Sequence, residues 1–126
     1  MMKAIILIIL ISTHCFATNN TTEPKLTFIG KRMINLGVVK EGEIISQKIF
    51  FTNSGDSTLV IKNTTKSCNC ANVTLKESRT FPKDTNYVSI TIDTKGKIGI
   101  NVVDVILNTN TLQKEHIIKV TMEVEK

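Results

Sequence analysis

The stretch that decides the fold is Asn53–Cys70, which reads NSGDSTLVIKNTTKSCNC. A polar turn at Asn53–Asp56 leads into a strand in which Leu59 and Ile61 share one face. The stretch then ends in two cysteines that are one residue apart. The turn and the strand indicate a β-sheet protein, and the two thiols are the side chains with the most evident chemistry.

The same pattern of short alternating strands and polar turns continues on both sides of this stretch. Several such strands at a spacing of about 8–12 residues, with no convincing helix, are typical of an all-β sandwich or barrel. Alternation of apolar and polar residues favours antiparallel sheets in which one face is exposed to solvent. The predicted strands are Lys25–Ile29, Leu36–Val39, Ile44–Thr52, Leu59–Lys62, Cys70–Leu75, Val88–Ile92, Val103–Leu107 and Ile118–Val124.

Residues 1–17 have the pattern of a secretory signal peptide. Lys3 precedes the apolar run Ala4–Ile11, which is too short for the roughly 20 apolar residues of a membrane-spanning helix. Ala17 is a suitable small residue before a cleavage site. The sequence therefore predicts export to the periplasm or the extracellular space, with no stable membrane span.

An alternative is a lipoprotein anchored at Cys15, but the bulky His14 before it disfavours lipidation. After the signal peptide, the polar residues 18–24 are expected to form a disordered leader. Residues 25–126 then have the length of one domain.

Charge and aromatic content argue against nucleic acid as a partner. The formal net charge is +5, but no run of five basic residues occurs. With one Tyr and no Trp, the chain has few aromatic side chains on which nucleic-acid bases could stack. We expect a protein partner, whose identity the sequence does not give, and the oligomeric state stays open.

Cys68 and Cys70 have four possible states in an exported protein. On one regular strand face their Cα atoms would lie about 6.6 Å apart with parallel side chains. A disulfide between them therefore closes only if the chain bends at Asn69. The alternatives are two thiolates binding a soft metal such as Cu(I), pairing with another chain, and reduced thiols buried in the core.

A third metal ligand is not evident from the sequence. Met122 alternates with core positions, Met33 lies near a turn, and His116 reads as a partly buried edge histidine. A single C-x-C motif is weak evidence for zinc, which takes four ligands in structural sites.

The order of motifs resembles the bacterial family called domain of unknown function 1573. The matching segments are LGVVKEGE at Leu36–Glu43, IFFTNSGDSTLVI at Ile49–Ile61, SCNC at Ser67–Cys70 and VSITIDTKGK at Val88–Lys97. The resemblance implies an immunoglobulin-like antiparallel β-sandwich of seven or eight strands in an exported protein. It implies no biochemical role.

Two positions depart from the family pattern. Asn69 stands where the family has Gly, and Lys83-Asp84 stands where it has Pro-Gly. Because Asn tolerates positive φ better than other non-glycine residues, we expect the bend at Asn69 to be kept.

The leading functional hypothesis is an exported, non-enzymatic, immunoglobulin-like binding or structural module. The sequence contains no serine-nucleophile motif, phosphate-binding glycine loop or HExxH motif. No cofactor is expected. The module would engage its partner by strand addition through a sheet face or an exposed edge, for which the strand Ile44–Phe51 is the candidate. Phe50, which points away from the core face of this strand, is the candidate partner contact. The alternative is a thiol-based redox or Cu(I)-binding protein that acts through Cys68 and Cys70, with copper as its cofactor.

Overall fold

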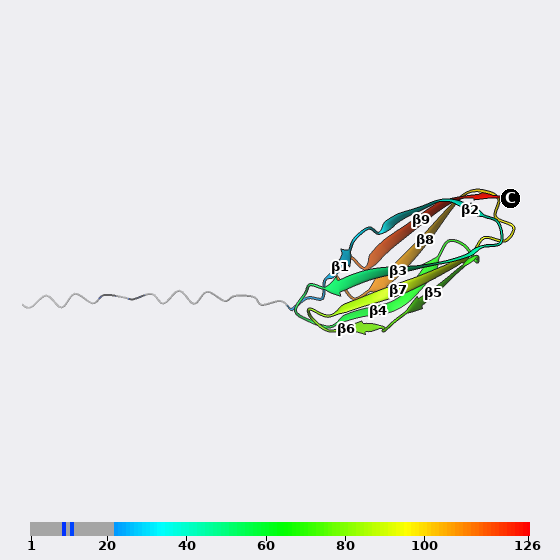
Figure 1. The fold of residues 1–126 in the computed structure, drawn as a ribbon. Helices are drawn as coiled ribbons and strands as arrows, with labels where there is room; N and C mark the ends of the chain where they lie inside the picture. The colour runs from blue at the N-terminus through cyan, green and yellow to red at the C-terminus, as the bar shows by residue number, and fades with distance from the viewer. Residues whose placement is uncertain (1–8, 10, 12–21) are drawn as a thin grey trace, which may run out of the picture.

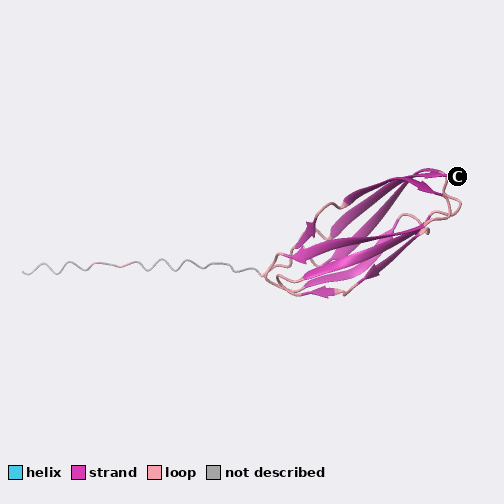
Figure 2. Cartoon of the chain, in the orientation of Figure 1, coloured by secondary structure: helices cyan, strands magenta, loops and turns pink. Residues whose placement is uncertain are grey.

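The protein is described by a computed structural model that covers residues 9, 11 and 22–126. The described residues form nine strands in two sheets that pack face to face as an elongated sandwich (Figure 1). The described residues contain no helix (Figure 2), and hence none that could cross a bilayer. Most of the expected signal peptide, including the cleavage site and Cys15, lies outside the described residues, as do leader residues 18–21.

The first sheet, called sheet A, has four antiparallel strands in the order β1-β3-β7-β5. Its central pair, β3 and β7, is long and in continuous register, with Ile49 opposite Val88. The strands are β1 (Leu26–Ile29), β3 (Ile44–Asn53), β5 (Ala71–Leu75) and β7 (Thr85–Asp93).

The second sheet, called sheet B, has five strands in the order β2-β9-β8-β4-β6. All neighbours are antiparallel except β2 and β9, which run parallel. The strands are β2 (Met33–Lys40), β4 (Leu59–Lys66), β6 (Arg79–Thr80), β8 (Gly99–Thr109) and β9 (Glu115–Glu125).

The structure confirms the all-β sandwich and adds one strand to the seven or eight predicted. The extra strand is β6, which has two residues and lies between the predicted strands Cys70–Leu75 and Val88–Ile92. It pairs with Leu59 and Val60 at the start of β4. A two-residue strand is too short to show a periodicity, so the sequence pattern could not reveal it.

The alternation of side chains along the strands builds the core. Val88, Ile90 and Ile92 on β7 are all buried, and so are the alternate residues of β9 from Ile118 to Val124. The largest fully buried side chain is Phe51, on β3. Because successive residues of a strand point to opposite faces, its neighbour Phe50 lies on the outer face of sheet A.

Asn53 holds together the end of the sandwich at which β1 begins. Its side-chain oxygen accepts hydrogen bonds from the backbone N–H of Lys25 and of Gly55, at 3.2 and 3.0 Å. Its amide nitrogen donates to the carbonyl oxygens of Ser57 and Thr80, at 2.8 and 2.9 Å. The side chain is fully buried, and these bonds connect the start of β1, the turn and β6.

The same turn requires a glycine at position 55. A Cβ atom there would lie 2.1 Å from the carbonyl oxygen of Glu23 and 2.6 Å from the backbone nitrogen of Lys25. The chain before β1 can therefore approach the turn only if residue 55 has no side chain. Glu23 also exchanges hydrogen bonds with Asp56, so the last residues of the expected leader pack on the sandwich.

Lys83 has a backbone conformation that glycine would adopt more easily. It is the one non-glycine residue with positive φ in the described chain, at 70°. Left-handed backbone costs an ordinary residue about 1 kcal/mol or more. The loop between β6 and β7 therefore bends at Lys83.

We expect Lys83→Gly to raise the free energy of unfolding by about 0.5–1 kcal/mol, because the relief of this conformation exceeds the added entropy of the unfolded chain. Chemical denaturation of the two proteins measures the difference. Lys95→Gly is the control and should not stabilise, because Lys95 lies in the turn between β7 and β8 without positive φ. Destabilisation by Lys83→Gly would contradict this account.

Candidate functional site

The two cysteines lie in a tight turn that carries the chain from sheet B to sheet A. Strand β4 ends at Lys66 and β5 begins at Ala71, so neither cysteine is in a strand. A disulfide joins Cys68 to Cys70, and their Cα atoms are 5.1 Å apart. The turn thus brings the two residues closer than the about 6.6 Å of a regular strand.

The bend does not depend on positive φ at Asn69. The expected bend at Asn69 is kept, but not through positive φ, because Lys83 is the only non-glycine residue with positive φ in residues 22–126. The turn closes instead through the N–H of Ala71, which donates to the carbonyl oxygen of Cys68 at 3.2 Å. The N–H of Cys70 also contacts the Sγ of Cys68 at 3.1 Å.

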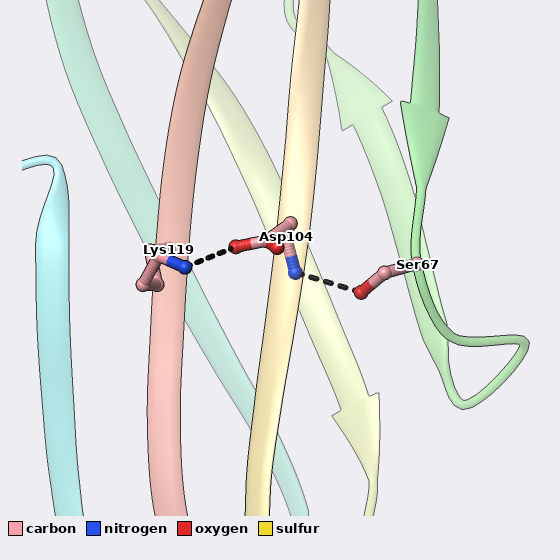
Figure 3. A network of polar contacts seen from close by, with 3 residues as sticks. All are labelled: Ser67, Asp104 and Lys119. Atoms are coloured by element: carbon pink, nitrogen blue, oxygen red, sulfur yellow. Dashed lines mark hydrogen bonds and ion pairs between the residues drawn. The ribbon is translucent and has the colours of Figure 1, made fainter.

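A polar network fixes the start of this turn to sheet B (Figure 3). The Ser67 hydroxyl oxygen accepts a hydrogen bond from the N–H of Asp104 on β8, at 2.8 Å. The N–H of Ser67 donates back to the carbonyl oxygen of Asp104, at 2.9 Å. The Asp104 carboxylate pairs with Lys119 on β9, at 3.1 Å. Just past Ser67 the chain reverses direction, so the network sets where the cysteine turn begins.

The end of the turn is fixed to sheet A. The N–H of Asp93, at the end of β7, donates to the carbonyl oxygen of Cys70 at 2.9 Å. The ammonium of Lys66 donates to the carbonyl oxygen of Ala71. The cysteine turn is therefore held on both sides by backbone that belongs to the two sheets.

Both cysteines are half-buried and pack against the hydrophobic core. Cys70 lines a narrow gap together with Met122 of β9, and Lys97 also borders this gap. The gap is too narrow to hold a water-sized sphere. Met122, which the sequence places in the core, therefore lines the same gap as Cys70 of the cysteine turn.

The other candidate ligands lie elsewhere or are occupied. Met33 is 65% exposed on β2, at the edge of sheet B. His116 is buried, and its Nε2 is 2.9 Å from the hydroxyl of Thr111. Within residues 22–126, no three His, Cys, Asp or Glu residues gather as a metal site.

His116 lines an open cleft of about 500 Å³ at the end of the sandwich, between the start of β1, the Ser54–Asp56 turn and the Thr111–Gln113 loop. Burial, together with the positive charge of Arg32, lowers the pKa of this histidine, while a hydrogen bond to the backbone of Gln113 opposes the shift. The folded protein therefore holds His116 neutral at a pH where the unfolded chain binds a proton.

We expect the free energy of unfolding to fall as pH decreases through about 6.5, the pKa of an unperturbed histidine. The sign follows because the unfolded state binds the proton first and is stabilised by it. Denaturation at about pH 7.5 and about pH 5.5 measures the effect, and His116→Gln should show a smaller loss of stability. The same pH dependence in both proteins would refute the role of His116.

Phe50, the predicted partner contact, is 42% exposed on the outer face of sheet A. The suggestion that its strand offers an exposed edge was wrong at this position, because β3 lies between β1 and β7. Phe50 is paired with Ile29 on one side and Tyr87 on the other. Strand addition at Phe50 is therefore blocked, and any contact there uses the face of the sheet.

Three apolar side chains form a continuous stripe across the strands at this position; we call Ile29, Phe50 and Tyr87 the aromatic patch. The rings of Phe50 and Tyr87 have centroids 5.4 Å apart. The ammonium of Lys48 lies 4.8 Å from the centroid of the Tyr87 ring, and that of Lys76 lies 5.7 Å from it. Sequence reasoning found Phe50 alone, since the rest depends on which strands are neighbours.

Comparison with known proteins supports the same fold. A protein of unknown function from Porphyromonas gingivalis W83 superposes with a TM-score of 0.74 at 16% identity, over 85% of this chain and 50% of that one. The VesB protease of Vibrio cholerae superposes with a TM-score of 0.61 at 14% identity, over 82% of this chain and 32% of that one. The ASH/PapD-like domain 7 of human CEP192 superposes with a TM-score of 0.51 at 14% identity, over 83% of this chain and 87% of that one.

These similarities show a shared fold and no more, because the identities are low. The chain spans half or less of the first two proteins. No curated protein matches the sequence. The sequence profile of DUF1573, a family of proteins of unknown function, matches residues 26–124, which is nearly all of the sandwich. The resemblance carried by the turn motifs and by Ser67–Cys70 is thereby confirmed, and this chain belongs to the DUF1573 family.

Proposed function

We propose that this chain is an exported, non-catalytic module that binds a protein partner through the aromatic patch on the outer face of sheet A. The proposal that it is not an enzyme rests on the sequence, which contains no recognised catalytic motif. Export rests on the signal-like pattern of residues 1–17. The immunoglobulin-like fold of an unknown-function family is compatible with a binding or structural role.

The observation that carries the proposal is the pairing of Phe50 with Tyr87 on an exposed sheet face. Aromatic residues are enriched at protein interfaces, and they supply much of the binding energy at the centre of an interface. Ile29 extends the apolar surface to a third strand. Sheet faces in water usually carry polar side chains, so this stripe is an exception that binding would explain.

The surroundings of the patch indicate the chemistry of the partner. Lys48 and Lys76 place two positive charges over the Tyr87 ring. An apolar side chain flanked by carboxylates would match both features of this surface. A second copy of the chain, docked symmetrically by the same patch, would bring these lysines together with their own counterparts, and the charge repulsion disfavours it.

The test compares purified bait proteins incubated with extract from the compartment in which the protein resides. The double variant Phe50→Ala/Tyr87→Ala should capture at least tenfold less of a protein that binds the wild-type bait specifically, as expected for central interface aromatics. Lys48→Glu/Lys76→Glu should lose the same protein, and its retention on the wild-type bait should fall with added salt.

Ile117→Ala is the matched control, because Ile117 is 45% exposed on the outer face of the opposite sheet. It should retain the bound protein in full. Equal capture by the wild-type bait and the aromatic double variant, with both folded, would overturn the proposal. Loss in the Ile117→Ala bait alone would move the binding surface to sheet B.

A further inference from the structure

The gap between the cysteine turn and β9 brings three sulfur atoms to one region of the molecule. Cys68 and Cys70 supply two of them at the turn, and Met122 faces the same gap as Cys70. We propose that the opened cysteine pair binds Cu(I) through the two thiolates, with the thioether of Met122 as the third ligand.

The ligand chemistry selects the metal. Thiolate and thioether sulfur are soft ligands, and among the common biological metals they favour Cu(I). Zinc would need a fourth ligand and prefers N, O or thiolate donors. The gap excludes water, so sulfur ligands would have no competition from a bound water molecule. A three-coordinate sulfur site with no water suits Cu(I) better than the harder divalent ions.

The charge of the site is also balanced. A Cu(I) ion with two thiolates and one neutral thioether has a net charge of −1. The ammonium of Lys66 is hydrogen-bonded to the carbonyl oxygen of Ala71 at the end of the turn. This cation would stabilise the anionic complex in a partly buried position.

Binding requires that the disulfide first be reduced. A dithiol reductant would transfer two electrons and two protons to the Cys68–Cys70 bond, giving two thiols and leaving the reductant as a disulfide. Cu(I) would then replace the two thiol protons, which are released to solvent. The site is therefore open only in the reduced protein, and reoxidation of the pair would expel the metal.

The turn can open without loss of its position. Ser67 is held to Asp104 on the sheet B side, and Cys70 is held to Asp93 on the sheet A side, in both cases by backbone hydrogen bonds. These bonds do not involve the sulfur atoms. Both cysteines are half-buried, so the disulfide is within reach of a reductant while the ligands remain preorganised.

The experiment is an anaerobic titration of the full chain with Cu(I) in competition with a chromogenic Cu(I) chelator, after reduction by a dithiol. The reduced wild-type protein should bind about one Cu(I) per chain, and the oxidised protein should bind none. Cys68→Ser/Cys70→Ser should bind at least a hundredfold more weakly than the reduced wild type. Equal affinity of the double variant and the reduced wild type would overturn the site.

Met122→Leu tests the third ligand, because this exchange nearly conserves volume and should leave the fold intact. The exchange should weaken Cu(I) binding at least tenfold, and X-ray absorption should count about two sulfur ligands in place of three. Met33→Leu is the matched control, since Met33 is exposed on β2, and its affinity should be unchanged. An unchanged affinity in Met122→Leu, with the same sulfur count as wild type, would remove Met122 from the site.

Discussion

Phe51→Ala is expected to lower the free energy of unfolding by about 3–5 kcal/mol, the range for a large aromatic removed from a packed core. Phe51 is fully buried on β3, the strand that pairs with both β1 and β7. Its ring is the largest fully buried side chain of the core. Removing it leaves a cavity between the two sheets. Urea denaturation monitored by circular dichroism measures the change.

The adjacent Phe50 provides the control for this prediction. Its ring lies outside the core on the opposite face of the same strand. We expect Phe50→Ala to cost less than about 1 kcal/mol, mainly through the lost contact with Tyr87. Similar losses in the two variants would contradict the assignment of inner and outer faces of sheet A.

Asn53→Ala should destabilise the protein by about 2–4 kcal/mol, because it leaves buried backbone groups without partners. The substitution removes all four hydrogen bonds of the side chain, to Lys25, Gly55, Ser57 and Thr80. It should also release the segment before β1, which amide hydrogen exchange of Lys25 and Gly55 would report.

Asn108→Ala is the matched control, since the Asn108 amide donates to the Asn63 side chain at an exposed position. It should cost less than about 0.5 kcal/mol. If Asn53→Ala were as mild as Asn108→Ala, the turn would not depend on the buried amide.

The strands were predictable from the sequence because each carries its own periodicity. Val88, Ile90 and Ile92 alternate with polar residues, and burial on one side of a sheet requires this pattern. Phe50 could be placed on the outer face of the sheet from the alternation of side chains along its strand alone. The turn at Asn53–Asp56 was evident from its residue types, although these did not show that the Asn53 side chain would also bond to Thr80.

The partners of each strand were not predictable from the sequence. Nothing in Met33–Lys40 shows that β2 runs parallel to β9, or that β3 lies between two neighbours. The aromatic patch depends on this pairing, because Ile29, Phe50 and Tyr87 meet only through the register of three strands.

The candidate metal site shows the same limit. The spacing of Cys68 and Cys70 marks them in the sequence, but Met122 lies more than fifty residues away. It lines the same gap as Cys70 because the two sheets face each other across the core. Likewise, Lys83 gave no signal of its positive φ, since lysine has no special preference for that conformation.

The aromatic patch and the cysteine turn lie toward opposite ends of sheet A. Tyr87 is near the start of β7, whereas Cys70 is bonded to Asp93 at the end of that strand. Substitutions at the two places share no contact and should act independently. Failure of the copper experiment would therefore leave the proposed binding function untouched, and the reverse also holds.

The most direct test of partner binding is photo-crosslinking in the cells that produce this protein. A benzophenone amino acid would replace Phe50 in one variant and Ile117, its equally exposed counterpart on sheet B, in another. We predict a discrete crosslinked adduct from position 50 that Lys48→Glu/Lys76→Glu abolishes, and none from position 117. No adduct at position 50, or the same adduct at both positions, would contradict the aromatic patch as the binding surface.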